Sequence, residues 1–226
     1  MERCYRSVTR GMLPFGNTRS QVTGVEVVSQ SAMKRTEPIP LRQRILDAAN
    51  DLFRRQGIRG IGVEAIAAAA GTNKMTLYRY FSSKDELIAE WVRGIVETKE
   101  QEWDDIAAQH PNDPQAQLVD WSRRVAKKFA EMEGRGSALM NALAELPERD
   151  HPARRVIDAH RQRERKRILK LCRDAGFADP ELAADQFYFL LEGAKACVQC
   201  VGLTKTGEHL VRLVDSMVES KSGARR

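Results

Sequence analysis

Apolar residues recur at helical spacing along nearly the whole chain after residue 40. In the first such segment, Leu41–Gln56, the residues Ile45, Ala49 and Phe53 fall on one stripe, as expected of a helix that buries one face. Gly57 follows this stripe, and glycine is a frequent residue at helix ends because it tolerates a positive φ. The pattern therefore predicts a helix over 41–56 that packs against other helices.

The same periodicity predicts six helices in the later part of the chain. Ser83 and Glu86 form a capping box at the start of the first, and Gly or Pro residues separate most of the others. The predicted ranges are 84 to about 109, 115–133, 137–146, 152–175, 180–202 and 208–220. No strand pattern and no internal repeat accompanies them. The sequence thus predicts an all-α fold with about nine helices in total.

The stretch between the first helix and these later ones predicts two short helices joined by a turn. Val63 and Ile66 open an apolar helical face, which ends at Gly71. Asn73 can cap the second short helix with its side chain, and Leu77 then faces inward. A helix, a glycine-containing turn and a short helix rich in polar, basic and aromatic side chains are typical of a helix-turn-helix motif.

Six sequence pieces occur together in this region: RQRILDAANDLF at 42–53, Gly57, VEAIA at 63–67, Ala70-Gly71, TLYRYF at 76–81 and SKDEL at 83–87. With this spacing, residues 42–88 resemble the DNA-binding domain of the TetR family of bacterial transcriptional regulators. The resemblance covers about a fifth of the chain. Gly62 stands where the family usually has a Ser or Thr helix cap. The resemblance implies about nine helices, with a DNA-binding head followed by a helical domain that binds a ligand and dimerises.

The expected domains follow from the helix pattern and the resemblance. We expect a flexible N-terminal arm at 1–33, which the native protein lacks if its translation starts at Met33. A helix-turn-helix DNA-binding domain is expected at 34–85, a helical effector-binding and dimerisation domain at 86–220, and a disordered tail at 221–226.

Basic residues are concentrated in the N-terminal part of the chain. Residues 1–84 carry a net charge of +8, whereas residues 85–226 carry −2. Such asymmetry indicates that the N-terminal part meets a polyanion such as DNA. A solvated basic surface is the alternative explanation.

The candidate DNA contacts gather on the second helix of the motif and beside it. A short helix in the major groove presents its first turns to base edges, and flanking residues contact phosphates. Tyr80 and Lys84 occupy positions that resemble the phosphate-contacting residues of the family. Half-buried packing of Tyr78 and Tyr80 is the alternative. The predicted DNA-binding residues are Thr72, Asn73, Lys74, Thr76, Tyr78, Arg79, Tyr80, Lys84 and Arg42.

An apolar ligand pocket is expected between the later helices. The candidate lining residues are Trp103, Trp121, Met140, His160, Phe187 and Tyr188, and an ordinary hydrophobic core accounts for them equally well. Six basic residues between 161 and 170 are interpreted as a solvated helix face. An anionic effector is the alternative partner for that run.

Cys197 and Cys200 form a CxxC pair on a predicted helix, where positions i and i+3 share a face. Buried core cysteines are the simpler interpretation, and a thiol or soft-metal sensor is the alternative. The four cysteines make no disulfide framework in a chain of 226 residues. We therefore expect no metal and no cofactor.

The sequence contains no motif that indicates an enzyme, a membrane protein or a secreted protein. There is no Gly-rich phosphate loop, no GxSxG and no HExxH, so an enzyme is not expected. No apolar run is long enough for a transmembrane helix, and no secretory signal is evident. These features predict a cytoplasmic location without a membrane partner.

The predicted function is sequence-specific transcriptional regulation, as a repressor that a small-molecule effector releases from a near-palindromic double-stranded operator. We expect a homodimer, because two DNA-binding domains are needed to address two half-sites. The resemblance implies that the helices at 180–202 and 208–220 form its interface. A thiol- or metal-responsive regulator on the same scaffold and a ligand-free architectural DNA-binding protein are the alternatives.

Overall fold

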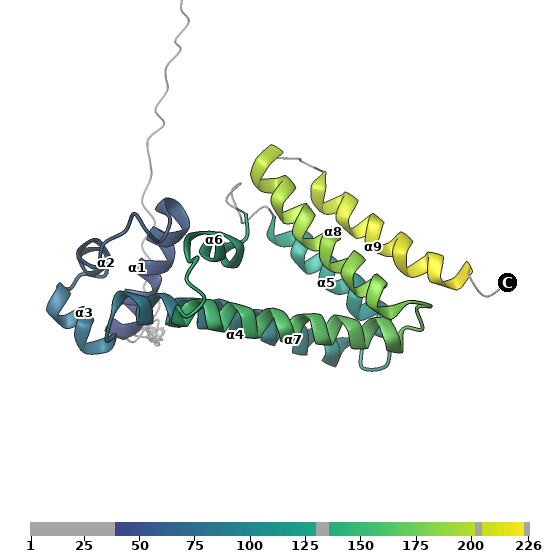
Figure 1. Ribbon diagram of the computed structural model, residues 1–226, viewed down its shortest axis with the longest axis horizontal. Coiled ribbons are helices and arrows are strands. Elements are labelled where there is room, and N and C mark those ends of the chain that lie inside the picture. The colour runs from purple at the N-terminus through teal and green to yellow at the C-terminus, as the bar shows by residue number, and fades with distance from the viewer. Residues whose placement is uncertain (1–38, 130–135, 202–204, 224–226) are drawn as a thin grey trace, which may run out of the picture. The chain divides into compact units, whose positions relative to one another are not determined.

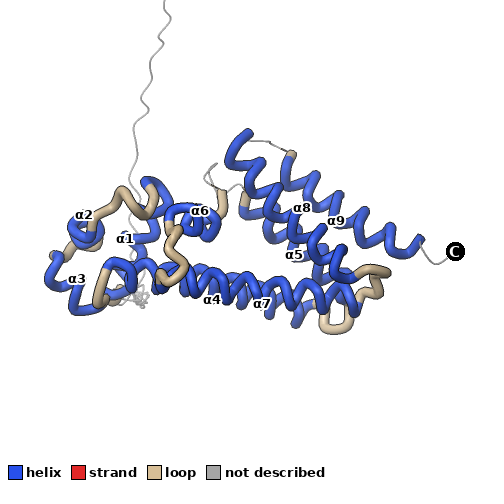
Figure 2. Tube along the Cα trace, viewed as in Figure 1, coloured by secondary structure: helices blue, strands red, loops and turns tan. Residues whose placement is uncertain are grey.

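The computed structural model describes residues 39–129, 136–201 and 205–223, and this part of the chain contains nine helices and no strand (Figures 1 and 2). The predicted all-α fold is confirmed. The predicted arm at 1–33 lies outside the described residues. The helices are α1 (Leu41–Gln56), α2 (Val63–Ala69), α3 (Lys74–Tyr80), α4 (Lys84–Gln109), α5 (Pro114–Lys128), α6 (Ala138–Glu145), α7 (Pro152–Asp174), α8 (Pro180–Val201) and α9 (Thr206–Gly223).

Most helix bounds lie within one or two residues of the predicted ones, and α1 has the predicted bounds. Two ends differ more. The prediction continued α5 to residue 133, but the helix ends at Lys128, and residues 130–135 lie outside the described part. The prediction ended the last helix at residue 220, whereas α9 continues to Gly223. The end of α5 has no strong local stop signal, because the next glycine, Gly134, lies six residues beyond Lys128, whereas α9 ends at a glycine, a residue typical of helix ends.

One hydrophobic core lies beneath the helix-turn-helix motif. It contains buried residues of α1, α2, α3 and the first part of α4, such as Ile45, Leu77 and Leu87. Leu139 of α6 and Ile157 of α7 belong to the same cluster. The helices α6 and α7 were expected in the second domain, so part of that domain packs directly onto the core of the DNA-binding domain. Residues 39–226 accordingly form one compact unit.

A second hydrophobic core joins the later helices. It contains Trp103 and Ile106 from the far end of α4 together with buried residues of α5, α7, α8 and α9. Because α4 contributes to both cores, it connects them physically, and α7 runs along it (Figure 1). The predicted domain boundary after residue 85 falls inside α4. No helix within the described ranges is long and apolar enough to cross a membrane.

Candidate nucleic-acid interface

The turn between α2 and α3 ends the first helix and redirects the chain. Gly71 has a φ of +67°, in the left-handed region that favours glycine. Its N–H donates to the carbonyl oxygen of Ala68 at 3.0 Å, and the N–H of Thr72 donates to that of Ala67 at 2.9 Å. This pair of bonds is the Schellman arrangement at a helix C-terminus. The turn is therefore fixed by backbone hydrogen bonds that need a left-handed residue at position 71.

The second helix of the motif starts where the sequence predicts. The Asn73 side chain accepts a hydrogen bond from the backbone N–H of Thr76 at 2.9 Å, which satisfies one of the free N–H groups in the first turn. Leu77 and Phe81 are buried in the first core. These two anchors hold α3 against α1 and α2, so its remaining side chains face outward.

The outward side chains of α3 include most of the predicted DNA contacts. Tyr78 is 39% exposed and Tyr80 is 46% exposed, which leaves much of each aromatic side chain at the surface. Thr72 and Thr76 are partly exposed. The exposed residues between the turn and the end of the helix are Asn73, Lys74, Met75, Tyr78, Arg79 and Tyr80. The structure thus brings together, on one short surface helix and the turn before it, seven of the nine residues proposed for DNA contact.

Met75 is one surface residue that the sequence prediction omitted. Its side chain is the most exposed of the large apolar residues in the described part of the chain. It lies three and four positions before Tyr78 and Arg79, so the three share one face of α3. That spacing could have added Met75 to the candidates, since methyl groups of thymine offer an apolar partner in the major groove.

Lys74 is paired with an acidic residue of the preceding helix. Its ammonium group donates to Glu64 Oε1 at 2.7 Å, and both side chains are exposed. The hydrogen bond to Lys74 lowers the pKa of Glu64 and raises the pKa of Lys74. Because the pair is exposed, a phosphate can compete for the lysine in solvent.

The two predicted contacts outside α3 are held by intramolecular interactions. Lys84 Nζ donates to the carbonyl oxygen of Ile58 at 2.8 Å, which ties the start of α4 to the α1–α2 connection. Arg42 pairs with Glu90 at 2.5 Å, and its guanidinium group lies 5.2 Å from the centroid of the Phe81 ring. Both residues therefore have a structural role in this conformation, and their contact with phosphate stays a prediction.

Three of the six predicted pocket residues lie inside the second core. The rings of Trp103 and Trp121 are stacked, with centroids 4.1 Å apart and planes inclined by 17°. Both indoles and Phe187 are fully buried. Their positions match the core interpretation that the sequence left open.

The other three predicted pocket residues are not part of the buried set of this core, although Tyr188 packs against it. His160 is buried on α7, and its Nδ1 lies 3.0 Å from Oε1 of Glu100 on α4. Burial alone would raise the pKa of Glu100, but hydrogen bonds from His160 and Arg163 lower it below the usual value. Met140 is exposed and Tyr188 is partly buried. The role of these six residues as a ligand pocket stays a prediction.

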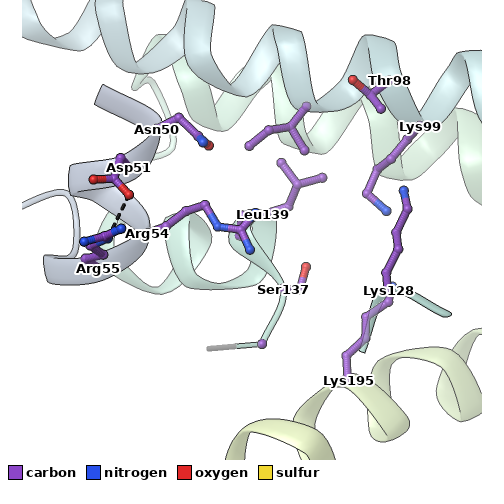
Figure 3. Close-up of a pocket in the computed structure, with 13 residues that line it drawn as sticks. Asn50, Asp51, Arg54, Arg55, Thr98, Lys99, Lys128, Ser137, Leu139 and Lys195 are labelled. Atoms are coloured by element: carbon purple, nitrogen blue, oxygen red, sulfur yellow. Dashed lines mark ion pairs between the residues drawn. The ribbon is translucent and has the colours of Figure 1, made fainter. Parts of the chain in front are cut away.

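A cavity of about 480 Å³ lies where the two cores meet (Figure 3). Its lining residues come from α1, α4, α5, α8 and the segment 136–139. None of the six predicted pocket residues is among them. The lining includes the basic side chains of Arg54, Lys99 and Lys195. These residues are far apart in the sequence, and no spacing rule connects them, so sequence analysis could not identify this site.

The cysteine interpretation is tested only in part. Cys172 is buried, and burial raises the pKa of its thiol to about 11. Cys197 is partly buried, and the side chain of Cys200 lies outside the described residues. Across the described ranges, no group of three His, Cys, Asp or Glu residues gathers as a metal site would require.

Comparisons with known proteins agree with this geometry. The sequence profile of the bacterial regulatory proteins of the TetR family matches residues 45–91. An uncharacterized HTH-type transcriptional regulator of Mycobacterium tuberculosis is 49% identical over 49 residues, which are 22% of this chain and 24% of that protein. The HTH-type transcriptional repressor SCO4008 of Streptomyces coelicolor is 40% identical over 57 residues, 25% of this chain and 30% of that one. The matches thus span only about a quarter to a third of these curated relatives.

The similarity to a solved structure extends over both cores. The crystal structure of SCO4454, a TetR-family transcriptional regulator from Streptomyces coelicolor, superposes with a TM-score of 0.75 and 27% sequence identity. The match covers 80% of this chain and 96% of that one. The similarity therefore includes the helices that follow the DNA-binding domain.

The fold and the capped, outward-facing α3 define a helix-turn-helix DNA-binding regulator. Residues 45–91 match the TetR family of bacterial transcriptional regulators, and the fold is similar to that of a TetR-family regulator. Regulators of this family are not enzymes; they bind DNA operators and act as dimers with small-molecule effectors.

Proposed function

We propose that this protein is a sequence-specific transcriptional repressor that binds an operator as a homodimer and leaves it when a small-molecule effector binds. The observation that carries the proposal is α3, a short helix anchored by buried residues on one side and lined with exposed polar, basic and aromatic side chains on the other. A helix of this kind fits the major groove of B-form DNA. Two curated relatives are named as repressors, which favours repression over activation.

The roles of individual residues follow from their chemistry. Tyr78 and Arg79 lie one turn into α3, where side chains reach base edges, and an arginine can form two hydrogen bonds with guanine. Thr72 and Asn73 lie in the turn, close to the helix N-terminus, where backbone N–H groups favour a phosphate. Lys74 adds a positive charge, for which a DNA phosphate competes with Glu64.

Replacing Arg79 with alanine is expected to weaken specific operator binding about 10- to 100-fold, as loss of a base-contacting arginine costs about 1–3 kcal/mol. Fluorescence anisotropy with an operator duplex measures the change. Arg123→Ala on α5 is the matched control, because Arg123 is also exposed but lies away from the motif. Equal affinity of the R79A variant and the wild type would remove Arg79 from the interface.

An apolar surface on the last two helices favours a dimer. Phe189 of α8 is 70% exposed, and Leu182 of α8 and Leu213 of α9 are more than half exposed. Residues 182 and 189 are seven positions apart, so they share one face of α8. Large apolar side chains at the surface of a folded chain commonly mark an interface. We therefore assign the dimer contact to α8 and α9.

Replacing Phe189 with glutamate is expected to convert the dimer to a monomer, because a buried unpaired charge opposes association. Light scattering after size-exclusion chromatography should then give 25.5 kDa, whereas the wild type should give twice that mass. Met75→Glu is the matched control, since Met75 is also exposed and apolar but lies on α3. A dimeric F189E variant would place the interface elsewhere.

The proposed effector response needs a physical link between ligand site and reading head. The segment that leads into α6 lines the cavity at Ser137. At the other end of α6, the Glu145 carboxylate accepts hydrogen bonds from the backbone N–H groups of Ile58 and Arg59, at 2.7 and 2.9 Å. A shift of α6 would thus act directly on the α1–α2 connection. A ligand that binds the shifted arrangement more tightly lowers the fraction of protein molecules in the DNA-binding conformation.

A further inference from the structure

The cavity between the two cores has a strongly basic lining. Five of its side chains are cationic, namely Arg54, Arg55, Lys99, Lys128 and Lys195, and one is acidic, Asp51. In Figure 3, Arg54 reaches in from α1 on one side, and the three lysines lie on the opposite side. Four separate helices supply these charges, so this is no solvated face of a single helix.

Three of the five cations already have a carboxylate partner. Arg55 pairs with Asp51 at 2.7 Å, Lys128 pairs with Glu102, and Lys195 pairs with Glu192 at 2.6 Å. Only Asp51 among these acids lines the cavity. The partners of Lys128 and Lys195 therefore hold the two lysines in place without filling the space between them and α1.

Lys99 and Arg54 have no carboxylate partner within the described part of the chain. The Lys99 ammonium group lies 5.6 Å from the centroid of the Trp121 ring, and its side chain is partly buried. Burial and the positive charges of Lys195 and Lys128 lower the pKa of Lys99 to about 8, although Glu164 and Glu192 act in the opposite direction. A crowded cation without a counter-ion is unfavourable, and a bound anion would relieve this cost.

The remaining lining suits the body of a small organic molecule. Ile95 and Leu139 provide apolar surface, and Thr98, Ser137 and Asn50 provide neutral hydrogen-bonding groups. A volume of about 480 Å³ lies within the range of small-molecule sites. A simple inorganic ion would leave most of this space and all of the apolar surface unused.

We propose that this cavity binds a small organic anion with a carboxylate or phosphate group, which pairs with Lys99 on one side and extends towards Arg54 and the apolar lining on the other. Because Arg54 belongs to α1 beneath the reading head and Lys99 to the middle of α4, such a ligand contacts both parts of the molecule. Its identification as the effector rests on the repressor function proposed above. The preference of the cavity for anions does not depend on that function.

Calorimetric titration with defined probes tests the site. Benzoate and phenyl phosphate are the anionic probes, benzyl alcohol is their neutral analogue, and the buffer contains no other carboxylate or phosphate. We expect at least one anion to bind at least about tenfold more tightly than benzyl alcohol. The tighter of the two probes then distinguishes a carboxylate from a phosphate ligand. The proposal would be overturned if neither anion bound more tightly than benzyl alcohol.

Two variants and one control locate the binding. Lys99→Met and Arg54→Met should each weaken anion binding at least about tenfold, because each removes a cation and keeps most of the side-chain volume. Lys127→Met should leave binding unchanged, since Lys127 is exposed on α5 and does not line the cavity. Wild-type affinity in both cavity variants would overturn the site, even if the protein binds anions elsewhere.

The pH dependence provides an independent readout. Benzoate keeps its charge above neutral pH, so a loss of affinity there reports the protein. Because the pKa of Lys99 is about 8, benzoate affinity should fall several-fold between about pH 7 and about pH 9, and the K99M variant should lack this fall. Lys195, Lys128, Glu164 and Glu192 share this environment. A fall that persists in K99M would show that Lys99 is not the anion-binding group.

The calorimetric experiment uses no DNA, so it separates the two proposals. Anion binding at this cavity without release of an operator duplex would contradict the effector mechanism and leave the anion site intact. Conversely, the protein could bind an operator and be released by a ligand, yet bind neither anion. That result would contradict the anion site and leave the repressor function intact.

Discussion

Replacing Trp103 with alanine is expected to lower the free energy of unfolding by about 3–5 kcal/mol, the usual cost of deleting a buried aromatic side chain. Trp103 is 1% exposed and stacks on Trp121 with 4.1 Å between ring centroids. The Arg167 guanidinium group lies 5.7 Å from its ring centroid. The truncation removes packing between α4 and the later helices, because the indole belongs to the second core.

Chemical denaturation at one fixed protein concentration measures this loss, since dimerisation also contributes to stability. Trp103→Phe is the control. It keeps an aromatic ring and removes an indole N–H that has no hydrogen-bond partner among the described residues. We therefore expect a loss of less than about 2 kcal/mol for W103F. A W103A variant within about 1 kcal/mol of the wild type would contradict the buried position of this side chain.

Replacing Gly71 with valine is expected to reduce specific DNA affinity at least about 100-fold, or about 2.7 kcal/mol. Gly71 has a φ of +67°, which a β-branched residue rarely adopts. A Cβ atom there would also lie 2.5 Å from Nη2 of Arg44, whose guanidinium group donates to the Ala70 carbonyl oxygen at the end of α2. The valine strains the turn and displaces this contact, so α3 is no longer held in one orientation.

Gly176→Val separates backbone strain from the local effect at the DNA-binding motif. Gly176 has a similar φ of +78°, and a Cβ atom there would meet nothing within 4 Å. This control should lose stability and keep its DNA affinity, because it lies between α7 and α8. Anisotropy with the operator duplex measures affinity, and circular dichroism verifies that both variants remain helical. Equal DNA affinity of G71V and G176V would show that the turn geometry does not control binding.

The sequence predicted those features of the fold that depend on neighbouring residues. The helix over 41–56 has the predicted bounds, because Pro40 and Gly57 mark its ends. The caps at Asn73 and Ser83 were also correct, and each accepts a hydrogen bond from the N–H three residues later. Such signals act over one helical turn, so a single sequence reveals them. The end of α5 has no such signal and was predicted wrongly.

For the candidate sites too, the sequence reveals the features that depend on neighbouring residues and misses those that depend on long-range contacts. The outward face of α3 follows from the spacing of Leu77 and Phe81, which are local anchors. The bond from Lys84 to Ile58 joins residues 26 positions apart, and no periodicity predicts it. The aromatic residues proposed for a pocket were chosen by size, yet size marks a core residue as strongly as a ligand contact. The cavity around Lys99 depends on the packing of five helices, α1, α4, α5, α6 and α8, which the sequence does not encode in any short pattern.

The measurement that tests the central claim most directly is fluorescence anisotropy with the DNA upstream of the protein's own gene. A shuffled duplex of the same length serves as the control, with both at about 150 mM salt, because nonspecific binding weakens as salt rises. If the protein reads a specific operator, it should prefer the upstream DNA at least about 1,000-fold. Equal, weak binding to both duplexes would contradict a specific operator in this region and would favour an architectural DNA-binding protein.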